Sequence, residues 1–269
     1  MKICRATKIM GIAAMLAMPM TKAHSQSDTL GMKSRMIAVG AANVLDTYLS
    51  PEKYKGTEVR YIYHSTRPTR WKDIEQTVMH QGELTMVKNR ADNNNELGAQ
   101  YNLQYHMRRR WQLTPQLAMA AGAAIDTHLG FLYNTRNSNN PAQAQACLNI
   151  GPSAAVSYST RIKSIELLIG YEAMAPLAGV MFSPNYGQSY YEIFSKGNYD
   201  HNVVFTTIAT TPSLMHMLTV DLRPWKRWSR TFLRIGYMGD YQQARINNLK
   251  QHHYSHMFIL GISTFLRRK

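Results

Sequence analysis

Cysteine is nearly absent from this chain of 269 residues. Only Cys4 and Cys147 occur, and Cys4 lies in an N-terminal segment that the sequence predicts to be removed. A single remaining thiol cannot form a disulfide within the chain. The fold must therefore be stabilised by burial of apolar surface and by backbone pairing.

Long apolar runs are also missing beyond the N-terminus. After residue 25, no stretch stays apolar for the about 18 residues that suggest a membrane helix, and the mean hydropathy is −0.34. These observations exclude a helical membrane protein. A mildly polar mean is expected for a membrane barrel, because only alternate residues of each strand face lipid.

Acidic residues are few, at 16 against 31 basic ones. Residues 1–25 hold Lys2, Arg5, Lys8 and Lys22 and no acid, so the remaining chain has 27 basic residues and a net charge of +11. Such an excess attracts anions. No nucleic-acid-binding motif is present, so we expect no nucleic-acid partner. Acidic lipid headgroups and lipopolysaccharide phosphates are the expected partners, and a solvated basic rim without a ligand is the alternative.

The first 25 residues have the three parts of a secretory signal peptide. They are a basic start, an apolar run from Ile9 to Met20, and a small-x-small cleavage site at Ala23-His24-Ser25. The apolar run is shorter than the roughly 20 residues that a spanning helix needs. We therefore expect export of a single mature domain, residues 26–269, because no linker divides it.

The clearest structural pattern is the stretch from Glu96 to Trp111, ELGAQYNLQYHMRRRW. Its odd positions, from Leu97 to Met107, are apolar or aromatic, and its even positions are mostly Gln, Asn, His and Arg. Side chains alternate between two faces along a strand. A half-buried strand of a soluble sandwich would show the same alternation. This run, however, is much longer than the usual strand of about five or six residues. It suits a transmembrane strand, which needs about nine to eleven residues with one face towards lipid.

The same period of two residues recurs along the chain. The other candidate strands are 36–44, 58–65, 74–90, 116–133, 147–159, 162–173, 190–195, 202–210, 214–223, 231–243 and 254–266. Together they predict an all-β fold: a closed antiparallel transmembrane β-barrel of about twelve strands, preceded by a signal peptide. Met36–Val44 and Tyr190–Ser195 are the weakest candidates, and without them the number is about ten, which is also even, as in bacterial single-chain barrels.

The connections between these strands differ in length on the two sides of the barrel. The turns at 114–115, 160–161 and 224–229 fall on one side, and the longer connections at 46–56, 134–146 and 176–189 fall on the other. Short periplasmic turns and longer external loops are the rule for such barrels. The last strand carries an aromatic residue, Phe265, near its end, as is usual for barrels delivered to the outer membrane. We therefore expect the barrel-assembly machinery as a partner, although the trailing Arg267-Arg268-Lys269 is atypical.

Three external segments carry polar and aromatic residues: DTYLSP at 46–51, YNTRNSNNPAQ at 133–143 and FSPNYGQSYYE at 182–192. Together with His201-Asn202 and the closing HYSHMFILG, they resemble an uncharacterised family of outer-membrane β-barrel proteins from double-membraned bacteria, catalogued as a domain of unknown function. The likeness runs from about Asp46 to Phe265. It implies the fold and the outer membrane, and it implies no activity.

The external segments supply the candidate binding residues. They are Asp46, Arg136, Asn137, Asn139, Asn140, Tyr186, Tyr190 and Tyr191. Asn side chains both donate and accept hydrogen bonds, and the planar cation of Arg136 suits a phosphate or carboxylate. The alternative is that Asn and Ser cap their own turns. The tyrosines could stack on a sugar or belong to the aromatic girdle of a barrel.

A lipid-modifying hydrolase is a second hypothesis. Asp126 and His128 share the polar face of one strand, and Ser138 or Ser189 could lie near them. A nucleophile, a base and an orienting group would have to lie within hydrogen-bond reach. No Gly-x-Ser-x-Gly signature is present, so the motif evidence is weak.

A narrow pore is the third hypothesis, in which Arg60, Arg108 and Arg234 on the polar faces would favour anions. We expect no cofactor. His252, His253 and His256 indicate a metal only weakly, because no cysteine or carboxylate accompanies them at ligand spacing, so no metal is expected. The leading hypothesis is a non-enzymatic outer-membrane barrel that is structural or binds an anionic glycolipid or a small solute.

Overall fold

The computed structural model describes residues 29–163, 165–223 and 230–267. The predicted signal peptide and the turn at 224–229 lie outside these residues. The elements are β1 (Thr29–Asp46), β2 (Tyr54–Pro68), β3 (Ile74–Lys88), β4 (Asn95–Gln112), β5 (Leu117–Asn134), β6 (Ala142–Ile162), β7 (Ile165–Met174), β8 (Ala178–Phe182), α2 (Tyr190–Phe194), β9 (Val203–Thr207), β10 (Leu214–Arg223), β11 (Thr231–Ile246) and β12 (Leu249–Arg267).

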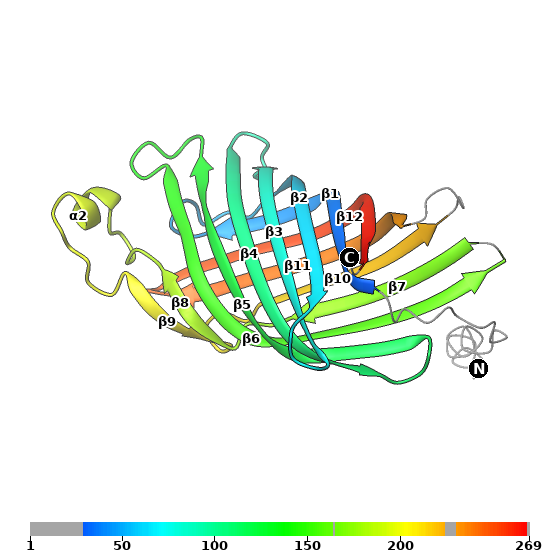
Figure 1. Ribbon diagram of the computed structural model, residues 1–269. Coiled ribbons are helices and arrows are strands. Elements are labelled where there is room, and N and C mark those ends of the chain that lie inside the picture. The colour runs from blue at the N-terminus through cyan, green and yellow to red at the C-terminus, as the bar shows by residue number, and fades with distance from the viewer. Residues whose placement is uncertain (1–28, 164, 224–229, 268–269) are drawn as a thin grey trace, which may run out of the picture.

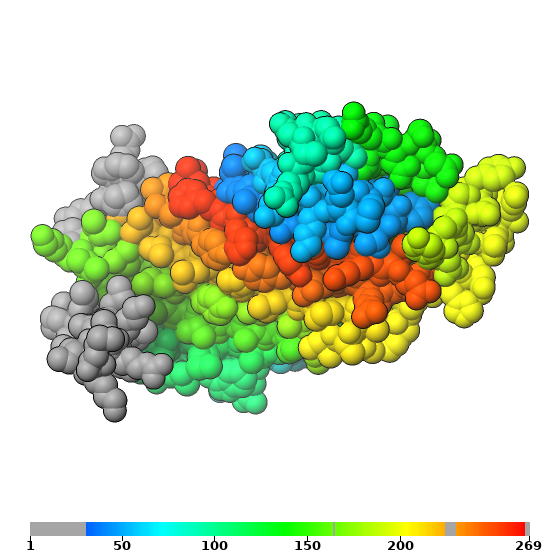
Figure 2. All heavy atoms as spheres, turned by 180° about the vertical axis from the view of Figure 1, so that it is seen from behind, coloured from blue at the N-terminus to red at the C-terminus, as the bar shows by residue number. Residues whose placement is uncertain are grey.

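The strands form a closed antiparallel barrel (Figure 1). Ten of them make the ring, in the order β1, β2, β3, β4, β5, β6, β7, β10, β11 and β12. The first and last strands pair along nearly their whole length, from Met32 opposite Phe265 to Asp46 opposite Gln251. In Figure 2 the C-terminal strands, in orange and red, accordingly lie beside the N-terminal ones, in blue. All described strand pairs are antiparallel, as the sequence predicts.

Two short strands, β8 and β9, extend the wall on the side of the barrel that carries α2 (Figure 1). β6 pairs with β7 over Ser153–Ile162 and with β8 over Ala146–Ile150, so β8 continues the line of β7. Pro176 lies at the interruption between them, where it has no backbone N–H to donate to a ladder. β9 in turn pairs with β8. We call the end with α2 the loop side and the opposite end the turn side.

The structure has twelve strands, but only ten close the ring, which is the smaller of the two numbers predicted, and one predicted strand is wrong. Tyr190–Ser195 is the helix α2, and the strand β8 lies in a segment predicted to be an external loop. Ser189 caps α2 by a reciprocal pair of bonds with Glu192: its hydroxyl accepts from the Glu192 backbone N–H at 3.2 Å, and its own backbone N–H donates to the Glu192 carboxylate at 2.7 Å. This capping box stabilises a first helical turn over the extended backbone.

The two faces of the wall differ as the two-residue period predicts. In β4 the even positions from Glu96 to Arg108 are buried towards the lumen except for half-buried Gly98, whereas Leu97, Tyr101 and Met107 are exposed on the outside. The outer face of the other strands is likewise apolar, for example at Ile37 in β1 and Leu84 in β3. In the part of the chain that the structure describes, no helix is both long and apolar enough to cross a membrane.

The lumen also contains an apolar layer that the sequence pattern did not predict. Six methionines, 36, 79, 215, 217, 238 and 257, are buried there with Ala38, Ile62 and Ile259. We call this cluster the methionine layer. It separates two cavities, because Met215 lines the one on the loop side and Met217 lines the one on the turn side. The free space is about 90 Å³ on the loop side and about 1040 Å³ on the turn side.

Candidate functional site

An ion-pair network centred on Arg60 lies in the lumen beside the methionine layer. The Arg60 guanidinium contacts Glu58, lies 3.0 Å from Glu83 and lies 2.7 Å from Asp240. All four side chains are buried. Because Glu58 and Glu83 come from β2 and β3 and Asp240 from β11, the network ties together two regions of the wall that are distant in sequence.

The other two lumen arginines are also paired. Arg108 lies 3.4 Å from Glu75 and 3.3 Å from Glu172, and Arg234 makes a two-pronged bond with Asp221 at 2.6 and 2.8 Å. Bidentate pairing of this kind fixes the planar guanidinium. The three arginines of the predicted basic lumen are therefore opposed by carboxylates, which removes the basis for anion preference.

Asp126 and His128 meet, as their shared face predicts. His128 Nε2 lies 2.9 Å from the Asp126 carboxylate, and His128 Nδ1 lies 2.9 Å from Gln100 Oε1. Asp126 also accepts hydrogen bonds from Asn102 at 2.6 Å and from Gln104 at 3.1 Å. Both imidazole nitrogens thus face acceptors, so neither is directed at a nucleophile. These hydrogen bonds hold the lumen side chains in place and do not present His128 as a general base.

The serines considered for catalysis lie elsewhere. Ser189 caps α2, and Ser138 is exposed in the loop between β5 and β6. Among the described residues, the hydrogen bonds of the His128 ring go to Gln100, Asn102 and Asp126 and to no serine.

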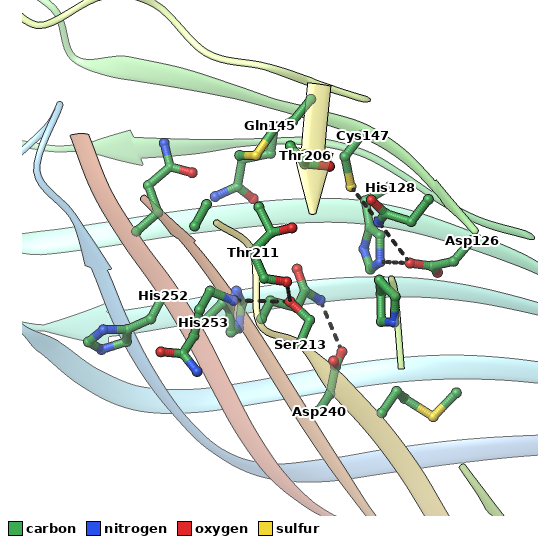
Figure 3. Close-up of a pocket in the computed structure, with 18 of the residues that line it drawn as sticks. Asp126, His128, Gln145, Cys147, Thr206, Thr211, Ser213, Asp240, His252 and His253 are labelled. Carbon is green, nitrogen blue, oxygen red and sulfur yellow. Dashed lines mark hydrogen bonds and ion pairs between the residues drawn. The ribbon is translucent and has the colours of Figure 1, made fainter. Parts of the chain in front are cut away.

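Seven amide side chains are among the residues that line the loop-side cavity, and Figure 3 shows Gln145 near Asp126 and His128 there. The amides are Gln100, Gln104, Gln145, Asn149, Gln242, Gln243 and Gln251. Cys147 also lines it, and its Sγ lies 3.4 Å from Asn149 Nδ2. Apolar side chains, among them Met174, Met181, Leu214 and Met215, form much of the remaining wall. Sequence analysis missed this site because the amides come from β4, β6, β11 and β12, and their proximity depends on barrel closure. The available signal was Gln and Asn on the lumen phase of several strands.

The three external segments contact one another above the cavity. Tyr48 donates its hydroxyl hydrogen to the Gln188 carbonyl at 3.0 Å, and its ring packs edge-on against Tyr190 at 5.8 Å. Asn137 donates to the Leu49 carbonyl at 3.1 Å. Asp46 is buried and accepts a bond from the Tyr48 backbone N–H at 3.0 Å. The structure therefore brings Asp46, Tyr190 and Asn137 into one cover over the loop side.

The Asn-rich loop uses most of its polar groups on itself. The Asn134 side chain accepts from the backbone N–H groups of Arg136 and Asn137, and Asn137 accepts from those of Asn139 and Asn140. This is the capped-turn alternative considered from the sequence. The Arg136 side chain is exposed, and within the described residues its guanidinium makes no hydrogen bond or ion pair.

The predicted tyrosines have separate surroundings. Tyr190 donates to Gln143 at 2.9 Å and accepts from the Ala144 backbone N–H at 2.7 Å, and burial raises the pKa of its hydroxyl to about 12. Tyr186 and Tyr191 are exposed, and the Lys196 ammonium lies 5.6 Å from the Tyr191 ring centroid. Tyr190 is therefore a structural contact, whereas Tyr186 and Tyr191 are free to meet another molecule.

One group of side chains has the spacing of metal ligands. Glu58, Glu83 and His253 each place a donor atom within 4.8 Å of the others. The Arg60 guanidinium already contacts both glutamates, so a metal ion would have to compete with a resident cation. His252 and His256 point to the other face, where His252 stacks on Tyr254 and His256 bonds to Tyr237.

A closed ring of long antiparallel strands with an apolar exterior and a largely polar lumen defines an outer-membrane β-barrel. The chain belongs to the family described as a protein of unknown function (DUF3316), whose model matches residues 7–268. No curated protein matches the chain. The resemblance stated from the sequence is thus confirmed, as is the outer-membrane location.

Several solved outer-membrane barrels are similar to the chain. The transport unit of the autotransporter AIDA-I from Escherichia coli is 8% identical, with 95% of this chain and 96% of that one covered and a TM-score of 0.47. The outer membrane protease OmpT from Escherichia coli is 5% identical, with 91% and 99% covered and a TM-score of 0.43. Neisserial surface protein A is 12% identical, with 87% and 96% covered and a TM-score of 0.33. The likeness concerns the fold alone.

Proposed function

We propose that this protein is a non-conducting surface barrel that binds a small uncharged solute in the loop-side cavity. The observation that carries this proposal is the amide lining of the cavity directly above the methionine layer. Amides both donate and accept hydrogen bonds without bearing charge. The carboxylates nearby are already engaged, Asp126 by His128 and Asp240 by Arg60. Hydroxyl and amide groups of a neutral ligand are therefore the best match.

The cavity sets an upper limit on the part of a ligand that it can enclose. Its free space of about 90 Å³ accommodates a head group of a few heavy atoms and excludes a folded peptide or a diacyl lipid. Drug-sized ligands occupy pockets of about 300–1,000 Å³. The bound group should accordingly be of the size of glycerol or of part of one sugar ring.

Cys147 allows a direct test, because it is the one cysteine of the chain after residue 25 and lines the cavity. The rate of its alkylation by N-ethylmaleimide is measured on the purified barrel with rising concentrations of N-acetylglucosamine or of monolaurin, two uncharged probes. We expect saturable protection by at least one probe, and loss of that protection in Gln145→Leu. Gln112→Leu, on the turn side, is the matched control and should behave like the unaltered protein. An alkylation rate that neither probe changes would refute the proposal.

A second candidate function, binding of an anionic glycolipid such as lipopolysaccharide, is supported by the loop-side rim. Lys55 lies directly opposite Lys88, and Arg245 directly opposite Lys250, all on the outer face. Like charges in such positions destabilise a strand pair unless anions neutralise them. Lys88 has Asp92 at 2.8 Å, whereas among the described residues no carboxylate pairs with Lys55, Arg245 or Lys250. At the turn side, one pair of neighbouring cations, Arg161 and Arg223, shares the carboxylate of Glu166.

The test replaces three loop-side cations together, as Lys55→Gln, Lys88→Gln and Lys250→Gln. Retention of purified lipopolysaccharide by the barrel should fall, and its dependence on salt should weaken, because fewer phosphates are neutralised. Replacing Arg70, Lys72 and Arg109 by Gln removes the same charge from the turn side and should leave retention unchanged. Equal loss in both variants would mean that net charge alone is responsible. Arg136→Ala tests the exposed loop cation separately.

A further inference from the structure

The barrel wall is less continuous on the loop side than on the turn side. β10 pairs with β11 from Leu222 opposite Leu233 up to Leu214 opposite Tyr241. β11 continues to Ile246, but from Gln242 onwards its only ladder partner among the described strands is β12. The strand that lies on the other side at this height is β9, whose ladder pairing is with β8. Within the described residues, β9 and the loop half of β11 therefore share no ladder. We call this junction the seam.

A few hydrogen bonds from the segment 208–213 bridge the seam. The Arg245 backbone N–H donates to the Thr210 carbonyl at 2.9 Å, and the Gln243 backbone N–H donates to the Ser213 hydroxyl at 3.3 Å. The segment itself is a turn, in which Thr210 and Thr211 donate backbone N–H groups to the Thr207 carbonyl. If the segment 208–213 formed a ladder with β11, the backbone N–H and C=O groups of alternate residues would bond directly to those of β11.

The loop-side cavity reaches both faces of the wall at the seam. Asp126, His128, Asp240 and His253 line it from the lumen phase of their strands. Gln243 and His252 also line it, although they share the phase of outward residues such as Tyr237 and Phe258. A cavity bounded by both faces of β11 and β12 has to pass through the wall or over its edge. Thr206 of β9 and Gln243 of β11 both line it, and Figure 3 shows Thr206, Thr211 and Ser213 around the same space.

The outer surface beside the seam is apolar. Val203 and Phe205 of β9 and Ile208 just after it are strongly exposed, and Leu214 begins β10 on the same outer face. Such residues on the exterior of a membrane barrel face acyl chains. A molecule that passes the seam would therefore move from a hydrocarbon environment into a cavity lined with amides. A single-chain amphiphile meets both environments at once, with its head among the amides and its chain beside Leu214 and Phe205.

We propose that the seam is a lateral opening through which a single-chain amphiphile with an uncharged head group reaches the loop-side cavity from the outer leaflet. The inference rests on the proposed solute binding, and it names both the ligand class and the route. A purely hydrophilic solute would instead approach through the external loops, where Tyr48, Gln188, Asn137 and Leu49 close the loop side by mutual hydrogen bonds.

The route is tested by alkylating Cys147 in the full-length barrel reconstituted in liposomes. Two reagents with the same reactive group are compared: N-dodecylmaleimide, which partitions into the bilayer, and N-ethylmaleimide, which stays largely in water. Ser213→Ala removes the acceptor for the Gln243 N–H at the seam. We expect it to accelerate labelling by N-dodecylmaleimide by about fivefold, the factor that corresponds to one hydrogen bond of about 1 kcal/mol. Labelling by N-ethylmaleimide should be nearly unchanged.

Thr47→Ala is the matched control, because the Thr47 hydroxyl accepts the Lys250 backbone N–H at 2.8 Å between β1 and β12, away from the seam. It should alter neither rate. Equal acceleration of both reagents by Ser213→Ala, or acceleration by Thr47→Ala as well, overturns the lateral route. Protection of Cys147 by N-acetylglucosamine but not by monolaurin also overturns the lateral route. That result would still support solute binding. Protection by neither probe refutes solute binding itself.

Discussion

Arg60 holds three carboxylates in the lumen, so its charge matters more than its volume. Replacing it by Met would leave Glu58, Glu83 and Asp240 close together and buried, with His253 as the remaining partner of the two glutamates. Removing one partner of a buried ion pair typically costs about 3–5 kcal/mol. We expect Arg60→Met to lower the free energy of unfolding of the reconstituted barrel by this amount, measured as a lower urea midpoint. Arg136→Met, at an exposed position, should stay within about 0.5 kcal/mol. Equal stability of the two variants would show that protons already neutralise the carboxylates.

The pairing of His128 gives a prediction about catalysis. Because one ring nitrogen faces Asp126 and the other faces Gln100, the ring is not available as a base for a serine. Phospholipid vesicles and lipopolysaccharide incubated with the protein should therefore keep their composition, as measured by mass spectrometry. Lipid turnover that His128→Ala abolishes would contradict this and restore the hydrolase hypothesis.

At the level of elements, the junction of β7 and β8 depends on Gly151 of β6. A Cβ atom at Gly151 would lie 2.1 Å from the Ala175 carbonyl oxygen and 2.9 Å from Pro176 Cα, so the backbone would have to move. We expect Gly151→Ala to destabilise the barrel by about 1–3 kcal/mol, the usual cost of overpacking. Gly82→Ala in β3 is the control, since nothing lies within 4 Å of its added Cβ. Similar unfolding midpoints for the two variants would show that the junction tolerates displacement.

The helix α2 depends on its cap. Hydrogen bonds from Ser189 lower the pKa of Glu192, so the carboxylate form that makes the capping box persists through the neutral range and is lost only as the pH falls through that lowered value. Ser189→Ala should raise hydrogen exchange at Ile193 and Ser195, whose backbone N–H groups donate within this turn. The increase should be constant across neutral pH, whereas Ser138→Ala should have no effect on the same amides.

The seam and α2 also mark where sequence reasoning about elements failed. Tyr190–Ser195 is one of the two weakest predicted strands, and the capping box of Ser189 and Glu192 makes it a helix. β8 was missed because Pro176 and Gly179 give the segment the composition of a loop, and pairing with β6 makes it a strand. The capping box of α2 lies within four residues of sequence, whereas β8 depends on pairing with a distant segment.

At the scale of the whole molecule, the methionine layer predicts a closed lumen. The unaltered barrel should show no conductance in planar bilayers, because the cluster is almost fully buried and lies between the two cavities. Met217→Ala with Met238→Ala should permit small currents without anion preference, since the lumen arginines are paired. Anion-selective conductance of the unaltered protein would instead support the pore hypothesis.

The sequence alone determined that this chain is a barrel and which side chains face inwards. That follows from a local rule, because successive side chains of any strand point to opposite faces whatever the strand pairs with. It also placed Asp126 beside His128, two residues apart on one strand. The tertiary structure decided the rest: which carboxylates surround Arg60, where six methionines meet, and which strands leave a seam. These features join residues from opposite ends of the chain, and their meeting depends on how the ring closes and in what register, which no local pattern specifies.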